Sequence, residues 1–168
     1  MNARKAILTG LRQLLEEKRL DQITVQDILD ASEVSRHTFY RYYQDKYDVI
    51  TSYYLDNITA QQKELTADSI RQITKQTVLF AMENRAFFLR AMGHGDINSL
   101  DHTIFQCSLR YCELLSGRAM AELPDAERFR AEFFAHGCVG TFRTWILEKE
   151  NPDAEELTDW ILALVPWK

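Results

Sequence analysis

Apolar residues recur every three or four positions along most of the chain, which is the spacing of one buried face of an α-helix. In the first segment Ile7, Leu11 and Leu15 follow this spacing, while polar residues such as Arg12 fall on the other side. The pattern predicts a first helix over residues 3–19. No segment shows the sustained alternation of apolar and polar residues that is typical of a half-buried strand. We therefore predict an all-α fold.

Two short helices follow the first one. Thr24 with Asp27 three residues later is a capping pattern, and it begins a second helix that ends near Ala31. After a short turn, Ser35 begins a third helix over residues 36–42. Two short helices joined by a turn of three or four residues have the spacing of a helix-turn-helix motif.

Longer helices make up the rest of the chain. Asp45 is suited to begin a fourth helix, and after about residue 65 glycines and prolines separate the remaining ones. These are predicted over residues 68–83, 86–92, 99–121, 125–149 and 154–165. We therefore divide the chain into a small N-terminal three-helix helix-turn-helix domain, residues 1–50, and a larger C-terminal helical domain, residues 51–168.

The predicted third helix carries side chains that suit DNA. Phe39 is expected to point inward, whereas the other positions of this helix are polar, aromatic or cationic. Arginine hydrogen-bonds guanine in the major groove, threonine contacts base edges, and tyrosine hydroxyls donate to phosphates. Lys46 and Thr24 each stand near the start of a helix, where backbone N–H groups favour a phosphate.

Two runs in this region carry a family resemblance. They are Thr24-Val25-Gln26-Asp27-Ile28, and Val34-Ser35 with Thr38-Phe39-Tyr40, Tyr42-Tyr43 and Asp45-Lys46. Capping, turn, aromatic and lysine positions agree in register, so residues 5–50 resemble the N-terminal domain of TetR-family transcriptional regulators. One position departs from the family pattern, because Glu33 stands where a glycine is usual. Glu33 is then required to adopt a turn conformation that glycine reaches more easily.

The resemblance implies a role for each matching residue. Phosphate contacts are implied for Tyr40, Tyr42 and Lys46, with Thr24 as a further backbone anchor. The base-reading positions are Ser35, Arg36, His37 and Thr38. Phe39 and Tyr43 fall at core positions. Arg41 is added as a phosphate contact, although a solvated cation is an equally good interpretation, and Tyr40 has the alternative of covering the turn.

The charge of the chain restricts which kind of DNA binding is possible. It has 20 Lys and Arg against 25 Asp and Glu, a net charge of −5, which argues against non-specific coating of nucleic acid. Residues 1–53 contain eight of each sign, and the whole deficit lies in residues 54–168. A neutral DNA-binding domain on an acidic body leaves binding to a specific site as the better interpretation.

The last two predicted helices offer a surface for a second copy of the chain. Two glycines within one helix cost stability and suggest close helix approach, with packing inside one chain as the alternative. The C-terminal region of one TetR-like branch resembles this segment, and the family dimerises through its last two helices. The predicted interface comprises Phe133, Gly137, Gly140, Thr141, Leu157, Trp160, Ile161 and Leu164.

Many members of the family bind a small inducer among their middle helices, and some work with a partner protein. The C-terminal domain is therefore a candidate dimerisation and ligand-binding domain. A pocket would draw on the aromatic set Phe80, Phe87, Phe88, Met92, Phe105, Tyr111 and Trp145. The same spacing also fits a plain apolar core, and no charged cluster among these residues identifies a ligand.

The sequence gives little support to an enzyme, a cofactor or a metal. It contains no nucleophile elbow, P-loop or dinucleotide fingerprint. His94, Asp96 and His102 lack a recurring ligand spacing, and the three cysteines lack a C-x-x-C pair, which fits a reducing compartment. Because no signal-peptide core or membrane-spanning stretch is present, we expect a cytoplasmic protein without a membrane partner.

These observations predict a DNA-binding transcriptional regulator, and we favour a repressor over an activator. It would bind a pseudo-palindromic operator as a homodimer and respond to an effector through its C-terminal domain. The alternative is a helical ligand- or protein-sensing module that acts through a partner protein and binds little DNA itself.

Overall fold

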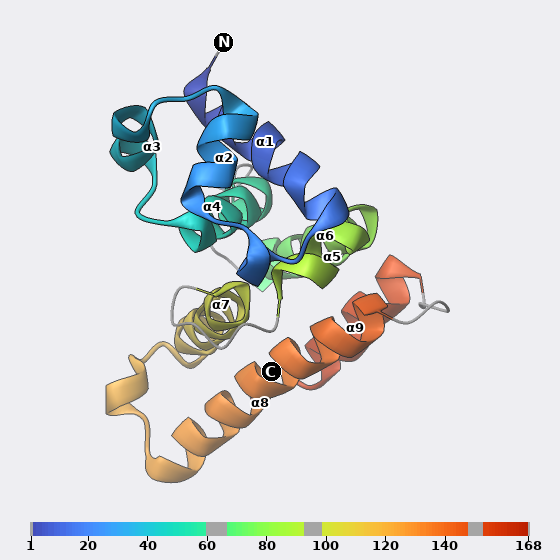
Figure 1. The fold of residues 1–168 in the computed structure, drawn as a ribbon. Coiled ribbons are helices and arrows are strands. Elements are labelled where there is room, and N and C mark those ends of the chain that lie inside the picture. The colour runs from blue at the N-terminus through green and yellow to red at the C-terminus, as the bar shows by residue number, and fades with distance from the viewer. Residues whose placement is uncertain (1, 60–66, 93–98, 148–152, 168) are drawn as a thin grey trace.

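The computed structural model describes residues 2–59, 67–92, 99–147 and 153–167, and over these residues it is helical without a strand (Figure 1). The predicted all-α fold is confirmed. The α-helices are α1 (Ala3–Glu17), α2 (Val25–Ser32), α3 (Arg36–Tyr42), α4 (Lys46–Thr59), α5 (Ala67–Glu83), α6 (Arg85–Ala91), α7 (Leu100–Ser116), α8 (Asp125–Leu147) and α9 (Ala154–Ala163). Two 3₁₀ turns, Leu20–Gln22 and Met120–Glu122, join helices.

Several predicted helices were too long at their C-terminal ends. The helix predicted over 99–121 ends at Ser116, because Gly117 adopts a left-handed conformation with φ +67° and reverses the chain. The first helix ends at Glu17 and the last at Ala163, two residues before each predicted end. The final residues predicted for α8, and the candidate ligands His94 and Asp96, lie outside the described residues.

The helix-turn-helix is built on a close crossing of α1 and α2. Gly10 of α1 faces the end of α2, and a Cβ atom at this position would lie 3.0 Å from the backbone nitrogen of Ser32. The turn between α2 and α3 runs through Glu33, whose φ of 54° and ψ of 30° are left-handed. The strained turn expected at Glu33 is therefore confirmed.

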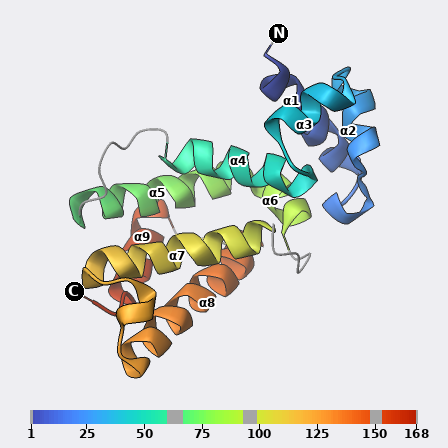
Figure 2. The same cartoon turned by 90° about the vertical axis from the view of Figure 1, so that its left-hand side faces the viewer.

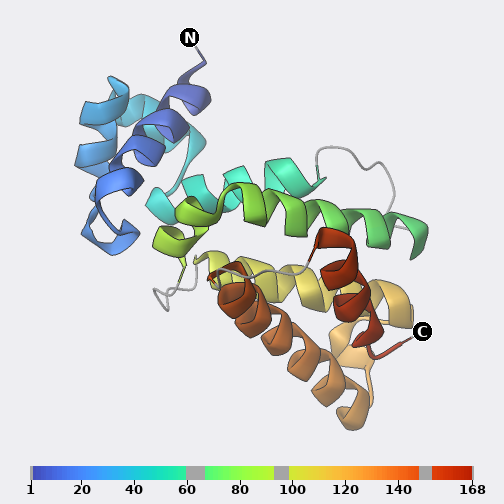
Figure 3. The same cartoon turned by 90° about the vertical axis from the view of Figure 1, so that its right-hand side faces the viewer.

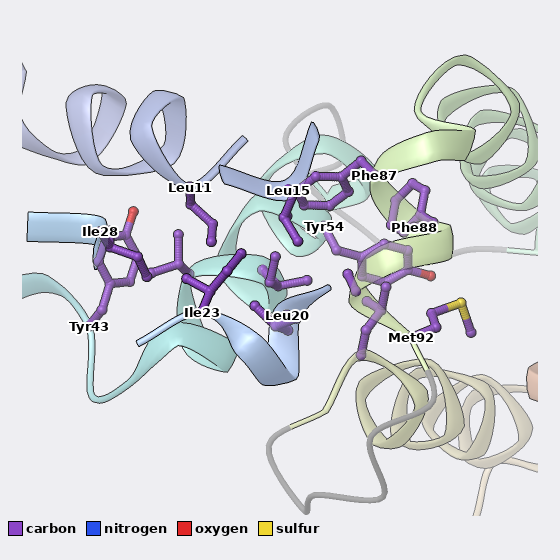
Figure 4. Packing of buried hydrophobic residues seen from close by; sticks show 14 of the residues in the cluster. Leu11, Leu15, Leu20, Ile23, Ile28, Tyr43, Tyr54, Phe87, Phe88 and Met92 are labelled. Carbon is purple, nitrogen blue, oxygen red and sulfur yellow. The ribbon is translucent and has the colours of Figure 1, made fainter. Parts of the chain in front are cut away.

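A single apolar core runs from the helix-turn-helix into the larger part of the chain (Figure 4). Ile28 of α2, Tyr54 of α4 and Phe88 of α6 belong to the same cluster, which reaches Ile104 of α7. A second, smaller cluster forms around Cys112 between α7, α8 and the end of the chain. Buried side chains of α4 belong to this shared core. The apolar packing therefore continues across the domain boundary that the sequence predicted near residue 50.

Helices α1–α3 lie at one end of the molecule, and α5 and α7–α9 form the body at the other (Figures 2 and 3). Helix α4 runs between the two, antiparallel to α5. Exposed ion pairs join α5 to α9, where Arg71 contacts both Glu155 and Asp159 and Lys75 contacts Glu155.

A polar contact attaches α1 to the body. The Arg12 guanidinium donates to the Tyr53 hydroxyl at 2.8 Å and to the Asn84 side-chain oxygen at 3.2 Å. The Tyr53 hydroxyl in turn donates to the same Asn84 oxygen at 3.1 Å. Residues of α1, α4 and the α5–α6 junction therefore meet at one point.

Candidate nucleic-acid interface

Helix α3 buries one side chain and turns the others outward. Phe39 is completely buried in the core, and Tyr43, directly after the helix, is buried beside it. Both core assignments are confirmed. Tyr40 on the other side is 49% exposed and only touches Phe39 edge to face. One anchoring residue thus holds a seven-residue helix against the domain.

The start of α3 is fixed by the side chain of the preceding residue, and its end by a backbone hydrogen bond. The Ser35 hydroxyl accepts the backbone N–H of Thr38 at 3.2 Å and donates to the Thr38 hydroxyl at 2.9 Å. Ser35 therefore begins the helix, as predicted. At the far end the Tyr43 N–H donates to the carbonyl of Phe39 at 3.0 Å.

The proposed base-reading and phosphate-binding side chains of α3 lie on the surface of the molecule. Ser35, Arg36, His37, Tyr40, Arg41 and Tyr42 are exposed and Thr38 is half-buried. Figure 1 shows α3 at the outer edge of the helix-turn-helix, with α2 between it and α1. The residues of this helix that the sequence predicted to contact DNA are therefore accessible from the solvent.

Two cations of α3 have partners on the surface. Arg36 donates to the side-chain oxygen of Gln26 in α2 at 2.7 Å. Arg41 donates to the Tyr42 hydroxyl at 2.9 Å, and its guanidinium lies 4.8 Å from the centre of that ring. Gln26 was not among the predicted site residues. Its contact depends on how α2 and α3 cross, which local spacing does not give.

Thr24 and Asp27 form the predicted capping box at the start of α2. The Thr24 hydroxyl accepts the backbone N–H of Asp27 at 3.1 Å, and the Thr24 N–H donates to the Asp27 carboxylate at 2.7 Å. The Thr24 hydroxyl also donates to this carboxylate at 2.6 Å. These hydrogen bonds from Thr24 favour the charged form and lower the pKa of Asp27. The role of Thr24 toward phosphate stays a prediction.

Lys46 has a structural role that the sequence did not predict. Its ammonium group donates to the carbonyl oxygens of Leu20 and Ile23, each at 2.6 Å, and lies 3.3 Å from that of Asp21. Lys46 thereby ties the start of α4 to the connection between α1 and α2. Its contact with phosphate also stays a prediction.

Five members of the predicted dimer set are exposed, on α8, on α9 or directly after α9. Phe133 is 72% exposed, Leu164 and Trp160 are also exposed, and a Cβ atom on Gly137 or Gly140 would meet nothing within 4 Å. Phe129, which the sequence reasoning missed, is equally exposed and stacks on Phe133 with ring centres 6.3 Å apart. The sequence could have indicated Phe129, because it stands four residues before Phe133 and falls on the same face of the helix.

The other three members of that set face the interior. Leu157 is buried, and together with Thr141 and Ile161 it lines a cavity in the body. These three side chains therefore do not share the surface of Phe133.

The cavity has a volume of about 480 Å³ and lies among α4, α5, α7, α8 and α9. Of the predicted pocket residues, Tyr111 and Trp145 line it. The other five do not. Phe87, Phe88 and Met92 are buried in the large core, Phe80 packs against it, and the centre of the Phe105 ring lies 4.6 Å from that of the His136 ring in a tilted arrangement. The helical registers of α5, α6 and α7 leave Phe80, Phe87, Phe88 and Phe105 outside the cavity lining.

Most of the cavity wall was not predicted because aliphatic residues and small hydroxyls form it. Examples are Ile58, Val78, Ile104, Thr77 and Ser108. Such residues have the same pattern as an ordinary helix face. Only the packing of five helices shows that they surround a space.

No group of three or more His, Cys, Asp or Glu side chains within the described residues could hold a metal ion. None of the helices in the described ranges is long and apolar enough to cross a membrane.

Comparisons with known proteins agree with this geometry. The family model for "Bacterial regulatory proteins, tetR family" matches residues 7–52. The model for "Transcriptional regulator C-terminal region" matches residues 68–166, more than half of the chain. The uncharacterized HTH-type transcriptional regulator YxbF of Bacillus subtilis (strain 168) is 26% identical over 115 residues, which cover 62% of this chain and 30% of that protein. The chain thus spans under a third of the length of this relative.

Two solved structures are similar to the chain. The dihydroxyacetone kinase operon activator DhaS has a TM-score of 0.64 and 17% identity, over 98% of this chain and 94% of that one. The TetR family repressor AlkX from Dietzia sp. strain DQ12-45-1b has a TM-score of 0.44 and 18% identity, over 97% and 98% of the two chains. The likeness to DhaS shows a shared fold.

The homologues are regulators, which points to a protein without catalytic activity. The two family models together cover both the helix-turn-helix and the helical body that the structure describes. The chain belongs to the TetR family of transcriptional regulators, with its DNA-binding helix-turn-helix within residues 7–52.

Proposed function

We propose that the chain acts as a homodimer that binds an operator of two inverted half-sites, with α3 of each copy in the major groove. The observation that carries this proposal is the outward face of α3, where cationic and aromatic side chains surround a single buried anchor, Phe39. A protruding α-helix fits the width of the major groove.

The arrangement of α3 supports a division of labour along the helix. Arg36 and His37 stand in its first turn, and the first residues of a recognition helix are those that reach base edges. Tyr40 and Tyr42 stand farther along, where their hydroxyls suit phosphate oxygens. The Arg36–Gln26 and Arg41–Tyr42 hydrogen bonds lie on the surface and can be exchanged for bonds to DNA at little cost.

Dimerisation through α8 and α9 is supported by the exposed rings of Phe129 and Phe133. A phenyl ring has no polar group for water, so a pair of them on the surface favours burial against another apolar face. A second copy would supply that face and the second half-site contact. Useful affinity for an operator generally requires both.

Regulation is supported by the position of α4. Tyr54 and Ile58 of this helix line the cavity, while its first residue, Lys46, is bonded to the helix-turn-helix. An effector that binds in the cavity and moves α4 would change the separation of the two α3 helices. We propose a cytoplasmic repressor that leaves its operator when an effector binds. The sign is tested with a promoter–reporter fusion in the presence and absence of the protein, where a repressor lowers expression.

The proposed function is tested by selecting bound sites from random duplex DNA with the purified protein. We expect an inverted repeat to be enriched. The variant Tyr40→Ala should lose this enrichment and keep its oligomeric state. Leu89→Ala, which removes a similarly exposed side chain from α6, is the matched control and should select the same sites. Lys46→Ala is unsuited to this test, because it also breaks the bonds to Leu20 and Ile23.

Failure of the wild-type protein to enrich any sequence would overturn the proposal. It would favour a sensing module that acts through a partner protein. The dimer is tested separately by sedimentation of Phe133→Ser, which should shift the wild-type dimer toward the monomer, whereas Leu79→Ser on α5 should not.

A further inference from the structure

Several polar groups on the cavity wall are already hydrogen-bonded within the protein. Thr74 donates to the Ile70 carbonyl at 3.0 Å, and Ser108 donates to the Ile104 carbonyl at 2.9 Å. The buried hydroxyl of Tyr54 is hydrogen-bonded with Thr77. A ligand inside the cavity therefore meets a surface that requires few hydrogen bonds from it, and an apolar body satisfies this surface best.

The ionisable groups inside the cavity are uncharged at neutral pH. Burial raises the pKa of the Cys138 thiol to about 11 and that of the Tyr111 phenol to about 12. Burial also raises the pKa of Cys107 and Tyr54. A charged ligand group placed among these residues would lose its hydration without gaining an opposite charge. The interior thus excludes charge.

The edge of the cavity has different chemistry. Three of its lining residues are exposed, namely Gln106, Arg110 and Leu114, and they are spaced four residues apart along one face of α7. The cavity therefore opens along this helix. Among the described residues, Arg110 is the only charged side chain in the lining, and none of them forms an ion pair with it. A single guanidinium stands at the mouth of an apolar space.

The volume sets the size of the occupant. At about 30 Å³ for each non-hydrogen atom, the share of a water molecule in the liquid, 480 Å³ holds roughly 16 such atoms. This is the size of a medium-chain amphiphile.

We propose that the cavity binds an amphipathic carboxylate, with its apolar chain among α4, α5, α7 and α8 and its carboxylate paired with Arg110. Arginine presents a fork of N–H donors that matches a carboxylate. The inference rests on the proposed function only in taking this cavity as the effector site. Ligand binding itself needs neither DNA nor a dimer.

The test is titration calorimetry of the purified full-length chain without DNA. The probes are sodium dodecanoate, 1-dodecanol and dodecyltrimethylammonium, which share a chain and differ in head-group charge. We expect dodecanoate to bind most tightly and the cation least. Arg110→Gln should weaken the binding of dodecanoate by about fivefold, which is the size of an exposed ion pair. The affinity for dodecanol should not change. Arg110→Glu should weaken dodecanoate further, and the matched control Arg118→Gln, outside the cavity lining, should bind like wild type.

A second readout locates the ligand. Trp145 lines the cavity, so dodecanoate should shift the tryptophan emission of the wild type, and Trp145→Phe should lose this shift. The inference is overturned if none of the probes binds, if dodecanol binds as tightly as dodecanoate, or if Arg110→Gln binds dodecanoate like wild type. Because the assay contains no DNA, each of these results leaves the proposal of operator binding standing. A failure of the operator selection, in turn, does not count against ligand binding in the cavity.

Discussion

The two ends of the molecule are packed differently. In the helix-turn-helix, Ile7, Leu11, Ile28 and Phe39 are all completely buried, and α1 approaches α2 so closely that a glycine is needed at the crossing. In the body, α5 and α7–α9 line a cavity of about 480 Å³ together with α4. The helix-turn-helix thus has a densely packed core, whereas the body contains a cavity.

The difference matches what each region has to do. Base contacts depend on a fixed position of α3, and a densely packed core resists deformation because its compressibility is low. A body that binds a ligand must offer volume, and the helices around a cavity rearrange at lower cost than those of a filled core. Helix α4 belongs to both regions, because Val49 and Ile50 are buried in the large core and Tyr54 also lines the cavity.

A matched pair of isoleucines tests this difference with the largest expected effect. Ile28 is completely buried in α2, and Ile73 of α5 is half-buried at the cavity wall. We expect Ile28→Ala to lower the free energy of unfolding by about 3 kcal/mol, and Ile73→Ala by about 1 kcal/mol. Urea unfolding at one fixed protein concentration measures both. Equal losses would contradict the contrast in packing.

The crossing of α1 and α2 is tested by Gly10→Ala. The new methyl group would lie 3.0 Å from the Ser32 backbone nitrogen, and the backbone cannot move aside as a flexible side chain does. We expect a net loss of about 1 kcal/mol, because overpacking outweighs the better helix propensity of alanine. Thr9→Ala, at the exposed neighbouring position, is the control for propensity. A Gly10→Ala protein more stable than wild type would show that the crossing is loose.

The last prediction concerns pH and only the body, since all three cysteines lie there. Burial raises the pKa of Cys112 to about 12 and of Cys138 to about 11, whereas unfolded thiols ionise near a pKa of about 8.5. Between those values the unfolded chain has already lost protons that the folded chain keeps, so stability falls as pH rises.

We therefore expect the melting temperature to drop by a few degrees between pH 7.5 and pH 9.5. The drop should be smaller in a variant with Cys107, Cys112 and Cys138 all changed to alanine. Differential scanning fluorimetry across this range compares the two. The same drop in both proteins would assign it to groups other than the thiols.

The sequence was sufficient where a feature depends on neighbouring residues. Thr24 and Ser35 begin helices through hydrogen bonds to residues three positions away, so their spacing alone indicates them. The outward face of α3 follows in the same way, because Phe39 is its one large apolar side chain without a polar group. The end of α7 was missed although its signal was local, since Gly117 is a typical terminating residue.

Features that depend on how helices cross could not be obtained from spacing. Phe88 contacts the rings of Tyr54, Phe80, Phe87 and Phe142, which come from four helices, so it is core rather than pocket. The bonds of Lys46 to Leu20 and Ile23 and the closeness of Gly10 to Ser32 likewise join different helices. The sequence singled out Phe88 and Lys46 but not their partners, and it did not single out Gly10.

The central claim is that α3 reads the bases of the operator, and His37→Ala tests it most directly. His37 is exposed in the first turn of α3, so its loss leaves the fold intact. The measurement is sequencing of the sites that this variant selects from random duplex DNA, beside those of the wild type. The account predicts that the base preference is relaxed at the same position of both half-sites while the rest of the inverted repeat is kept. An unchanged preference at every position would contradict the placement of α3 in the major groove.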